Sequence, residues 1–113
     1  MTDTNKEVEE LLSGLGARVV YSSPAECGEL PAVSYYMLSE KGGFSCDNDE
    51  SMTDIRVQVD VWAAAGKACS ELAARAAELL KDGGFCRELA MDIPKGDDGV
   101  YHRTMRFAKS YVL

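Results

Sequence analysis

The sequence is poor in the residues on which metal sites and catalytic sites depend. The four cysteines are too far apart to form a Cys-x-x-Cys pair: Cys27, Cys46, Cys69 and Cys86. A structural zinc site needs closely spaced cysteine or histidine ligands, so we expect four reduced thiols and no metal or other cofactor. His102 is the only histidine. A general base usually needs an orienting partner, and the acids nearest to His102 in sequence lie in a turn, so we expect no catalytic role for it.

Long apolar runs and an excess of basic residues are also missing. No stretch approaches the ~18 apolar residues of a membrane helix. The first residues lack the apolar core of a signal peptide, so we expect a protein that stays in the cytoplasm where it is made. The net charge of −7 argues against nucleic acid as the main partner, because phosphate binding needs a basic surface.

The negative charge is concentrated in the first half of the chain. Residues 1–50 hold ten of the 19 acids but three of the 12 bases, whereas the two signs balance in residues 51–113. An acidic half of this kind is most often a solvated surface. It can also complement a basic partner or a neighbouring subunit.

One acidic stretch has a partial calcium-binding pattern. Residues 47–51 (DNDES) resemble the start of an EF-hand loop. That pattern then requires glycine, where Met52 stands, and later glutamate, where Gln58 stands. We therefore interpret the stretch as an exposed acidic loop. The Gly-Gly pairs elsewhere lack the context of a phosphate-binding loop and are interpreted as turns.

The clearest positive signal is a strand followed by a helix. Residues 55–62 alternate apolar and polar side chains without a break, as a half-buried strand does. Apolar residues then recur at steps of three and four, which predicts one buried helix face ending near residue 81. We expect these two elements and the last strand to supply the core: Ile55, Val57, Val59, Val61, Leu72, Leu79, Met105 and Phe107.

The ends of the predicted helices carry recognisable signals. Thr4 and Glu7 fit a capping box, and apolar residues follow at helical spacing up to Leu15. At the end of the second helix, Gly83 suits the left-handed C′ position and Phe85 the apolar contact that accompanies it.

The remaining segments predict strands and their connections. Short β-prone runs cover 17–21 and 32–38, and a polar connection covers 40–53. Residues 85–93 and 100–113 predict a hairpin. The result is a single domain over residues 1–113 of the α+β class, with two layers: a mainly antiparallel sheet and two helices on one face. The predicted order is α-β-β-β-α-β-β. We expect the connection 40–53 to become ordered only in an assembly.

Trp62 has two open interpretations. By strict alternation it leaves the valine face of the strand. It either caps the end of the sheet beneath the helix, or is a partly exposed aromatic at an interface, where tryptophan is enriched.

Several stretches resemble the tail-completion, or tail-terminator, proteins of long-tailed bacteriophages. Residues 30–35 (LPAVSY) are similar to that family's proline-led entry into its second strand. Residues 55–62 (IRVQVDVW) resemble its central strand, and residues 103–107 (RTMRF) its closing strand. The resemblance extends over nearly the whole chain in layout and size.

The resemblance implies a structural role without catalysis. Such proteins form a ring, typically hexameric, at the head-proximal end of the tail tube, where the ring stops tube growth and helps join tail to head. The implied partners are other copies of the chain, the tail tube protein and a head-neck connector protein. The implied location is the bacterial cytoplasm during assembly and then the virion tail.

Two other functions stay open at the level of sequence. One is another phage neck protein, for head closure or head–tail joining. The other is a small enzyme or a ligand- or metal-binding domain that uses the acidic loop and His102. For an assembly role, the candidate interface residues are Phe44, Asp47, Asp49, Glu50 and Trp62.

Overall fold

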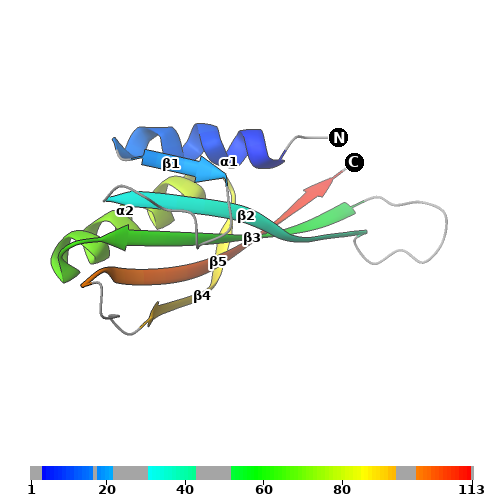
Figure 1. Cartoon of the computed structure of the whole chain (residues 1–113). Helices are drawn as coiled ribbons and strands as arrows, with labels where there is room; N and C mark the ends of the chain where they lie inside the picture. The colour runs from blue at the N-terminus through cyan, green and yellow to red at the C-terminus, as the bar shows by residue number, and fades with distance from the viewer. Residues whose placement is uncertain (1–3, 17, 22–30, 43–51, 94–98, 113) are drawn as a thin grey trace.

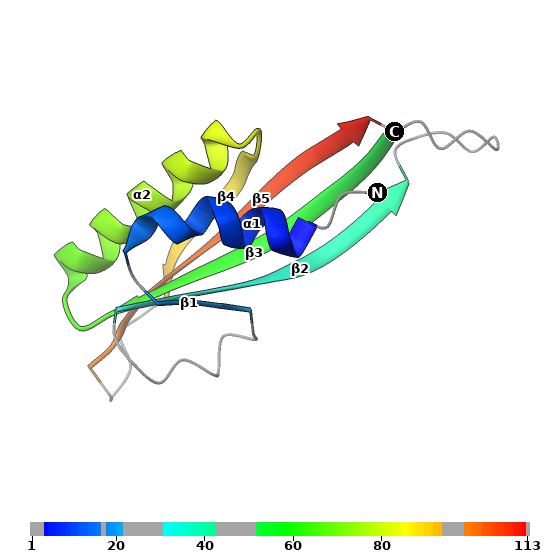
Figure 2. The ribbon, with the colours of Figure 1, turned by 90° about the horizontal axis from the view of Figure 1, so that it is seen from above.

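The protein has two layers, a sheet and a pair of helices on one of its faces (Figures 1 and 2). The computed structural model describes residues 4–16, 18–21, 31–42, 52–93 and 99–112. The strands are β1 (Arg18–Tyr21), β2 (Ala32–Gly42), β3 (Met52–Ala63), β4 (Cys86–Ile93) and β5 (Tyr101–Val112). The helices are α1 (Thr4–Leu12), continued by the 3₁₀ turn η1 (Ser13–Leu15), and α2 (Gly66–Asp82).

The sheet has the strand order β1-β2-β3-β5-β4. β2, β3, β5 and β4 pair with their neighbours in antiparallel orientation. β1 pairs in parallel with β2. The α+β class is therefore confirmed. The helices and strands follow one another along the chain as α-β-β-β-α-β-β, as predicted, but β1 does not belong to the antiparallel part of the sheet. The antiparallel strands and the two helices by themselves read α-β-β-α-β-β. The β-prone run 17–21 adds only a four-residue parallel strand at one edge, because propensity does not specify the direction of pairing.

The β2–β3 hairpin is longer than the predicted strands. Gly42 pairs with Thr53 and Lys41 with Asp54, so both ends of the predicted connection 40–53 belong to the ladder. Polar composition suggested a loop there, but main-chain pairing with a neighbouring strand overrides composition. Residues 43–51 lie outside the described part of the chain. They contain the calcium-like stretch and four of the five candidate interface residues.

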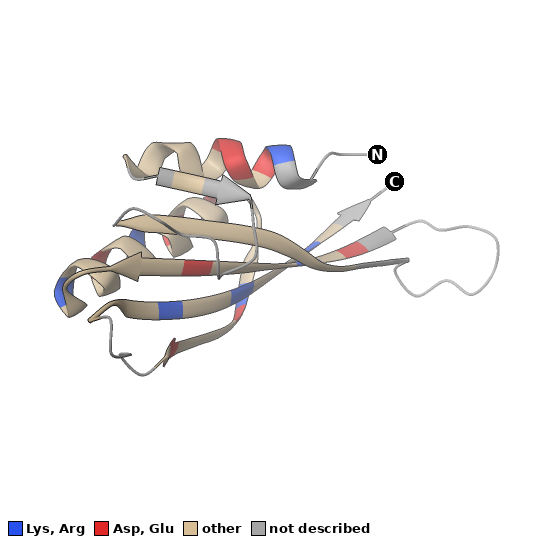
Figure 3. Cartoon of the chain, in the orientation of Figure 1, with Lys and Arg blue, Asp and Glu red and all other residues tan. Residues whose placement is uncertain are grey.

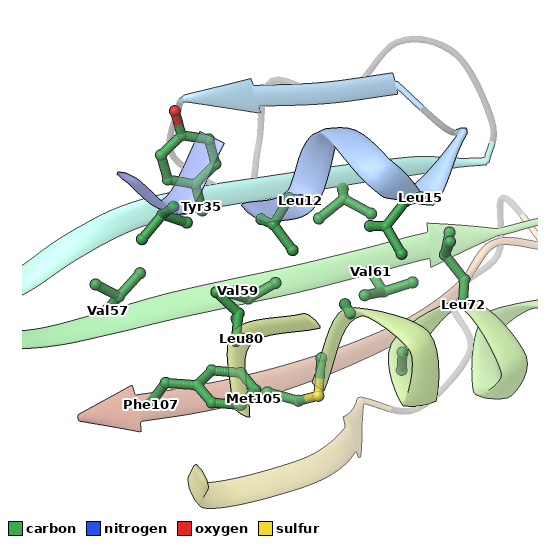
Figure 4. Close-up of a cluster of buried hydrophobic side chains, with 14 of the residues drawn as sticks. Leu12, Leu15, Tyr35, Val57, Val59, Val61, Leu72, Leu80, Met105 and Phe107 are labelled. Atoms are coloured by element: carbon green, nitrogen blue, oxygen red, sulfur yellow. The ribbon is translucent and has the colours of Figure 1, made fainter. Parts of the chain in front are cut away.

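The core lies between the sheet and the helices (Figure 4). The alternate residues Ile55, Val57, Val59 and Val61 of β3 are at most 1% exposed. Leu72, Met105 and Phe107 are also buried, as predicted. Leu79 was predicted in the core but is only partly buried. The next residue, Leu80, is fully buried instead. Helix α1 contributes further buried side chains: Val8 and Leu12, with Leu15 of η1 beside them.

A Schellman motif ends α2, one residue later than predicted. Gly83 has φ −83° and is therefore not left-handed, while Gly84 has φ +97°. The Gly84 amide donates to the Lys81 carbonyl at 2.9 Å, and the Phe85 amide donates to the Leu80 carbonyl at 3.0 Å. This is the paired hydrogen-bond pattern of the motif, and the buried Phe85 supplies its apolar contact.

The two glycines serve different purposes. Gly84 provides a left-handed conformation, whereas a side chain at Gly83 would overlap Leu11 of α1. We expect Gly84→Ala to lower the free energy of unfolding by about 1–2 kcal/mol, because a β-carbon is strained at positive φ. Denaturant unfolding followed by circular dichroism measures this change.

Gly14→Ala is the matched control for that prediction. An added β-carbon at Gly14 meets only the Leu79 methyls, at the ordinary contact distance of 3.7 Å. We expect Gly14→Ala to change stability by no more than about 0.5 kcal/mol. Equal stability losses in the two variants would contradict the assignment of Gly84 as the strained position.

Lys109 joins α1, the end of α2 and β5. Its Nζ donates to Glu7 Oε1 at 2.8 Å and to the Gly83 carbonyl at 2.7 Å, and it lies 5.3 Å from the centre of the Phe85 ring. Positively charged groups near the carbonyls at a helix C-terminus stabilise that terminus. The predicted capping box depends on the Thr4 side chain, which lies outside the described part.

Candidate assembly surface

The sheet has a second face, which neither helix covers. Cross-strand partners share a face, so the polar residues of β3 and their partners on β2, β4 and β5 point away from the helices. We call this side of the sheet the open face. Its residues include Ser34, Arg56, Gln58, Asp60, Trp62, Leu89, Met91, His102, Thr104 and Arg106.

A buried carboxylate lies at the centre of the open face. The Asp60 side chain is 1% exposed, and its Oδ1 lies 2.7 Å from His102 Nε2. Gln58 Nε2 donates to the other carboxylate oxygen at 3.0 Å. The hydroxyl of Thr104, the cross-strand neighbour of Asp60, is buried without a hydrogen-bond partner among the described atoms. Asp60 therefore links two strands through a polar cluster, and such a cluster specifies strand register when it is satisfied.

Trp62 covers this polar cluster. Its ring stacks on His102 with centroids 3.7 Å apart and an interplanar angle of 15°. Its Nε1 donates to Ser34 Oγ at 3.4 Å. The interpretation that Trp62 lies beneath the helix is wrong, because strand alternation places it on the open face. Its side chain is partly exposed, and its role at an interface remains a proposal.

The cluster supplies the partner for His102 that the sequence did not reveal. Asp60 precedes His102 by 42 residues, and the antiparallel pairing of β3 with β5 brings them together. The sequence signal was an acid in the polar register of β3, close to the end of the alternating run. Ser34, the hydroxyl bonded to Trp62, is fully buried and makes no hydrogen bond to His102. The described residues therefore present no nucleophile activated by this histidine.

The described residues also contain no group of three or more histidine, cysteine, aspartate or glutamate side chains that would hold a metal ion. Among their cysteines, Cys69 is buried on α2 and its Sγ donates to the Val61 carbonyl at 3.7 Å. Burial raises the pKa of the Cys69 thiol, and the Asp92 carboxylate acts in the same direction. Cys69 is thus a small apolar residue with low reactivity, whereas Cys86 is exposed.

Exposed apolar side chains gather on β4, an edge strand of the sheet. Leu89 is 37% and Met91 47% exposed, and both belong to the open face. Arg56 of β3 reaches toward this edge, and its Nε lies 3.0 Å from Glu88 Oε1. On its outer side β4 pairs with no other strand of the described chain. An edge strand with exposed apolar residues is a place where a second chain can bind.

None of the helices in the described part is long and apolar enough to cross a bilayer.

No protein-family model matches the sequence, and no curated protein is significantly similar to it in sequence. Solved structures do share its fold. The gp17 protein of bacteriophage SPP1 is 18% identical, with a TM-score of 0.57 over 92% of this chain and 85% of that one. A chain in the virion of a native gene transfer agent particle is 16% identical, with a TM-score of 0.52 over 89% and 88%. At these identities the likeness shows a shared fold over almost the full length of each chain.

Proposed function

We propose that the protein is a virion assembly protein without catalytic activity, which caps the head-proximal end of a phage-type tail tube and helps join tail to head. The observation that carries the proposal is the fold. It is shared over nearly the whole chain with a bacteriophage protein and with a component of a gene transfer agent virion. The sequence resemblance to tail terminators narrows this to the end of the tail. The protein acts in the bacterial cytoplasm during assembly and then in the virion.

The active form in this proposal is a closed ring of six copies. A ring needs a heterologous contact, in which two different sides of the subunit meet. The two lateral sides of this domain do differ, since α1 and β1 form one and α2 and β4 the other (Figure 2). Acids predominate on α1 and basic residues lie on β5, whereas the edge strand β4 carries residues of both signs (Figure 3).

The free protein can be monomeric under this proposal. Each contact between neighbours can be weak alone if the tip of the tail tube holds several copies together, because tethering raises their effective concentration. The implied partners are therefore the tube protein on one side and a head-neck connector protein on the other.

Deletion of the gene from its phage or prophage tests the assignment. We expect filled heads beside tails that are over-long and not joined, because tube growth is no longer stopped and the joining surface is missing. Electron microscopy of the particles measures both features, and a plasmid copy of the wild-type gene should restore normal particles.

Other phenotypes would assign the protein elsewhere. Tails of normal length that fail to join would favour a head–tail joining protein, and heads that lose their DNA would favour head closure. Normal particles, or a failure of DNA packaging, would contradict a role at the tail end.

A further inference from the structure

A groove runs between α2 and the edge strand β4, on the helix side of the sheet. Its largest pocket has a volume of about 440 Å³. Phe85 and Phe107 form an apolar floor, and Ala74 and Ala77 of α2 form one wall. A second hollow of about 170 Å³ continues the groove along α2 toward Met105. The small side chains of α2 leave this space open, and a phenyl ring would fit in the larger pocket.

The rim of the groove carries two cations that form no ion pair within the described residues. Lys81 and Arg87 line the main pocket, are exposed, and form no ion pair with the described part of the chain. Glu78 is the one acid on this rim, so the two cations are in excess. An apolar pocket beside unpaired cations is suited to an aromatic side chain with acidic neighbours.

We propose that residues 43–51 of a second copy of this chain dock in the groove between α2 and β4. Phe44 fills the pocket over Phe85 and Phe107, and the acids at 47, 49 and 50 lie against Lys81 and Arg87. This inference rests on the proposed function, because it identifies the contact between neighbouring subunits of the ring.

The composition of the segment and its position in the fold support this occupant. Residues 43–51 contain one aromatic residue, three acids and no base, which complements the groove. The strands β2 and β3 extend beyond the helices at one end of the sheet (Figures 1 and 2). The contact joins two different parts of the subunit, so it is heterologous and suits a ring.

Two native cysteines can report the contact. Cys46 lies inside the segment, and the exposed Cys86 lines the pocket. Cys86 pairs with Ala108, the partner of Arg56, so its thiol lies on the open-face side of the edge strand. Docking would bring Cys46 to this edge, and mild oxidation would then link the two thiols across two copies. Cys27→Ser removes the remaining cysteine whose exposure is undescribed, and the buried Cys69 reacts slowly.

In the experiment, ¹⁴N and ¹⁵N full-length protein are mixed, oxidised briefly and digested without reduction. Mass spectrometry then counts the links. We expect the Cys46–Cys86 link between copies to exceed either like–like link by about tenfold, since docking raises the effective concentration of one pair. A ratio of about two, as random collisions give for equally reactive thiols, would overturn the proposal. A link confined to single copies, or no link at all at a protein concentration high enough to populate a weak contact, would also overturn it.

Charge reversal adds a matched set of variants. Lys81→Glu with Arg87→Glu reverses the charge of the groove, and Asp47→Lys with Asp49→Lys and Glu50→Lys reverses the charge of the segment. We expect each reversed protein alone to lose most of the link, and their mixture to regain it. Lys67→Glu, an exposed cation of α2 outside the groove, should leave the yield unchanged. Failure of the mixture to regain the link would count against the charge contact.

The docking contact and the proposed function can fail independently of each other. Over-long tails after deletion, with full rescue by the groove-reversed protein, would leave the proposed function standing and reject this contact. The specific link in purified protein, together with normal particles after deletion, would do the opposite.

Discussion

Val59→Asp is expected to abolish folding. Val59 is 0% exposed in the central strand β3, where it pairs with Tyr35 on one side and Met105 on the other. A carboxylate there would lie in the apolar layer between sheet and helices, with no cation to pair with. An unpaired buried charge costs several kcal/mol, a large part of the about 5–15 kcal/mol by which a domain is stable.

The measurement is thermal and denaturant unfolding followed by circular dichroism. Met91→Asp is the matched control, because it also replaces an apolar strand residue with aspartate but at a position that is 47% exposed. We expect the control to remain folded with a melting transition close to that of wild type. A Val59→Asp protein that melts like wild type would refute the position of the core.

Asp60→Ala is expected to produce the second-largest loss of stability. The carboxylate accepts hydrogen bonds on both oxygens, and its side chain is 1% exposed. Its removal leaves Gln58 and His102 without their acceptor and opens space beneath Trp62. Because His102 is 15% exposed and water can reach it, we expect a loss of about 2–3 kcal/mol rather than the full cost of a broken buried ion pair.

A double-mutant cycle isolates the interaction itself. The free energies of unfolding are measured for Asp60→Ala, His102→Ala and the double variant, and we expect a coupling energy above about 1 kcal/mol between residues in direct contact. Near-ultraviolet circular dichroism should also change in each single variant, because the Trp62 ring loses its fixed partner. Additive effects would show that the pair does not stabilise the fold.

The prediction from sequence succeeded where one local period settles the structure. The alternation in β3 placed four valine and isoleucine side chains in the core, and the helical period placed Leu72 against them. The end of α2 was only approximately predictable. Gly83 and Gly84 are adjacent, and the sequence does not tell which of them takes the left-handed conformation that ends the helix. The structure assigns it to Gly84 and shows that a β-carbon at Gly83 would overlap Leu11 of α1.

Prediction was weaker for pairing between distant segments. The polar residues at both ends of the β2–β3 connection indicated a loop, but they pair in the ladder. The Asp60–His102–Trp62 cluster was hard to predict for the same reason. Alternation indicated that Trp62 leaves the apolar face, yet its contact with His102 depends on the antiparallel register of β3 and β5. Asp60 was absent from the candidate residues for that reason.

The sequence by itself therefore determined the α+β class, the buried face of β3 and α2, and the concentration of acids in the first half of the chain. These properties follow from side-chain period and composition, which are local. Only the tertiary structure decided the parallel edge strand β1, the Asp60–His102–Trp62 cluster, and the groove between α2 and β4. Each of these depends on which strands become neighbours, and that choice is made by the packing of the whole chain.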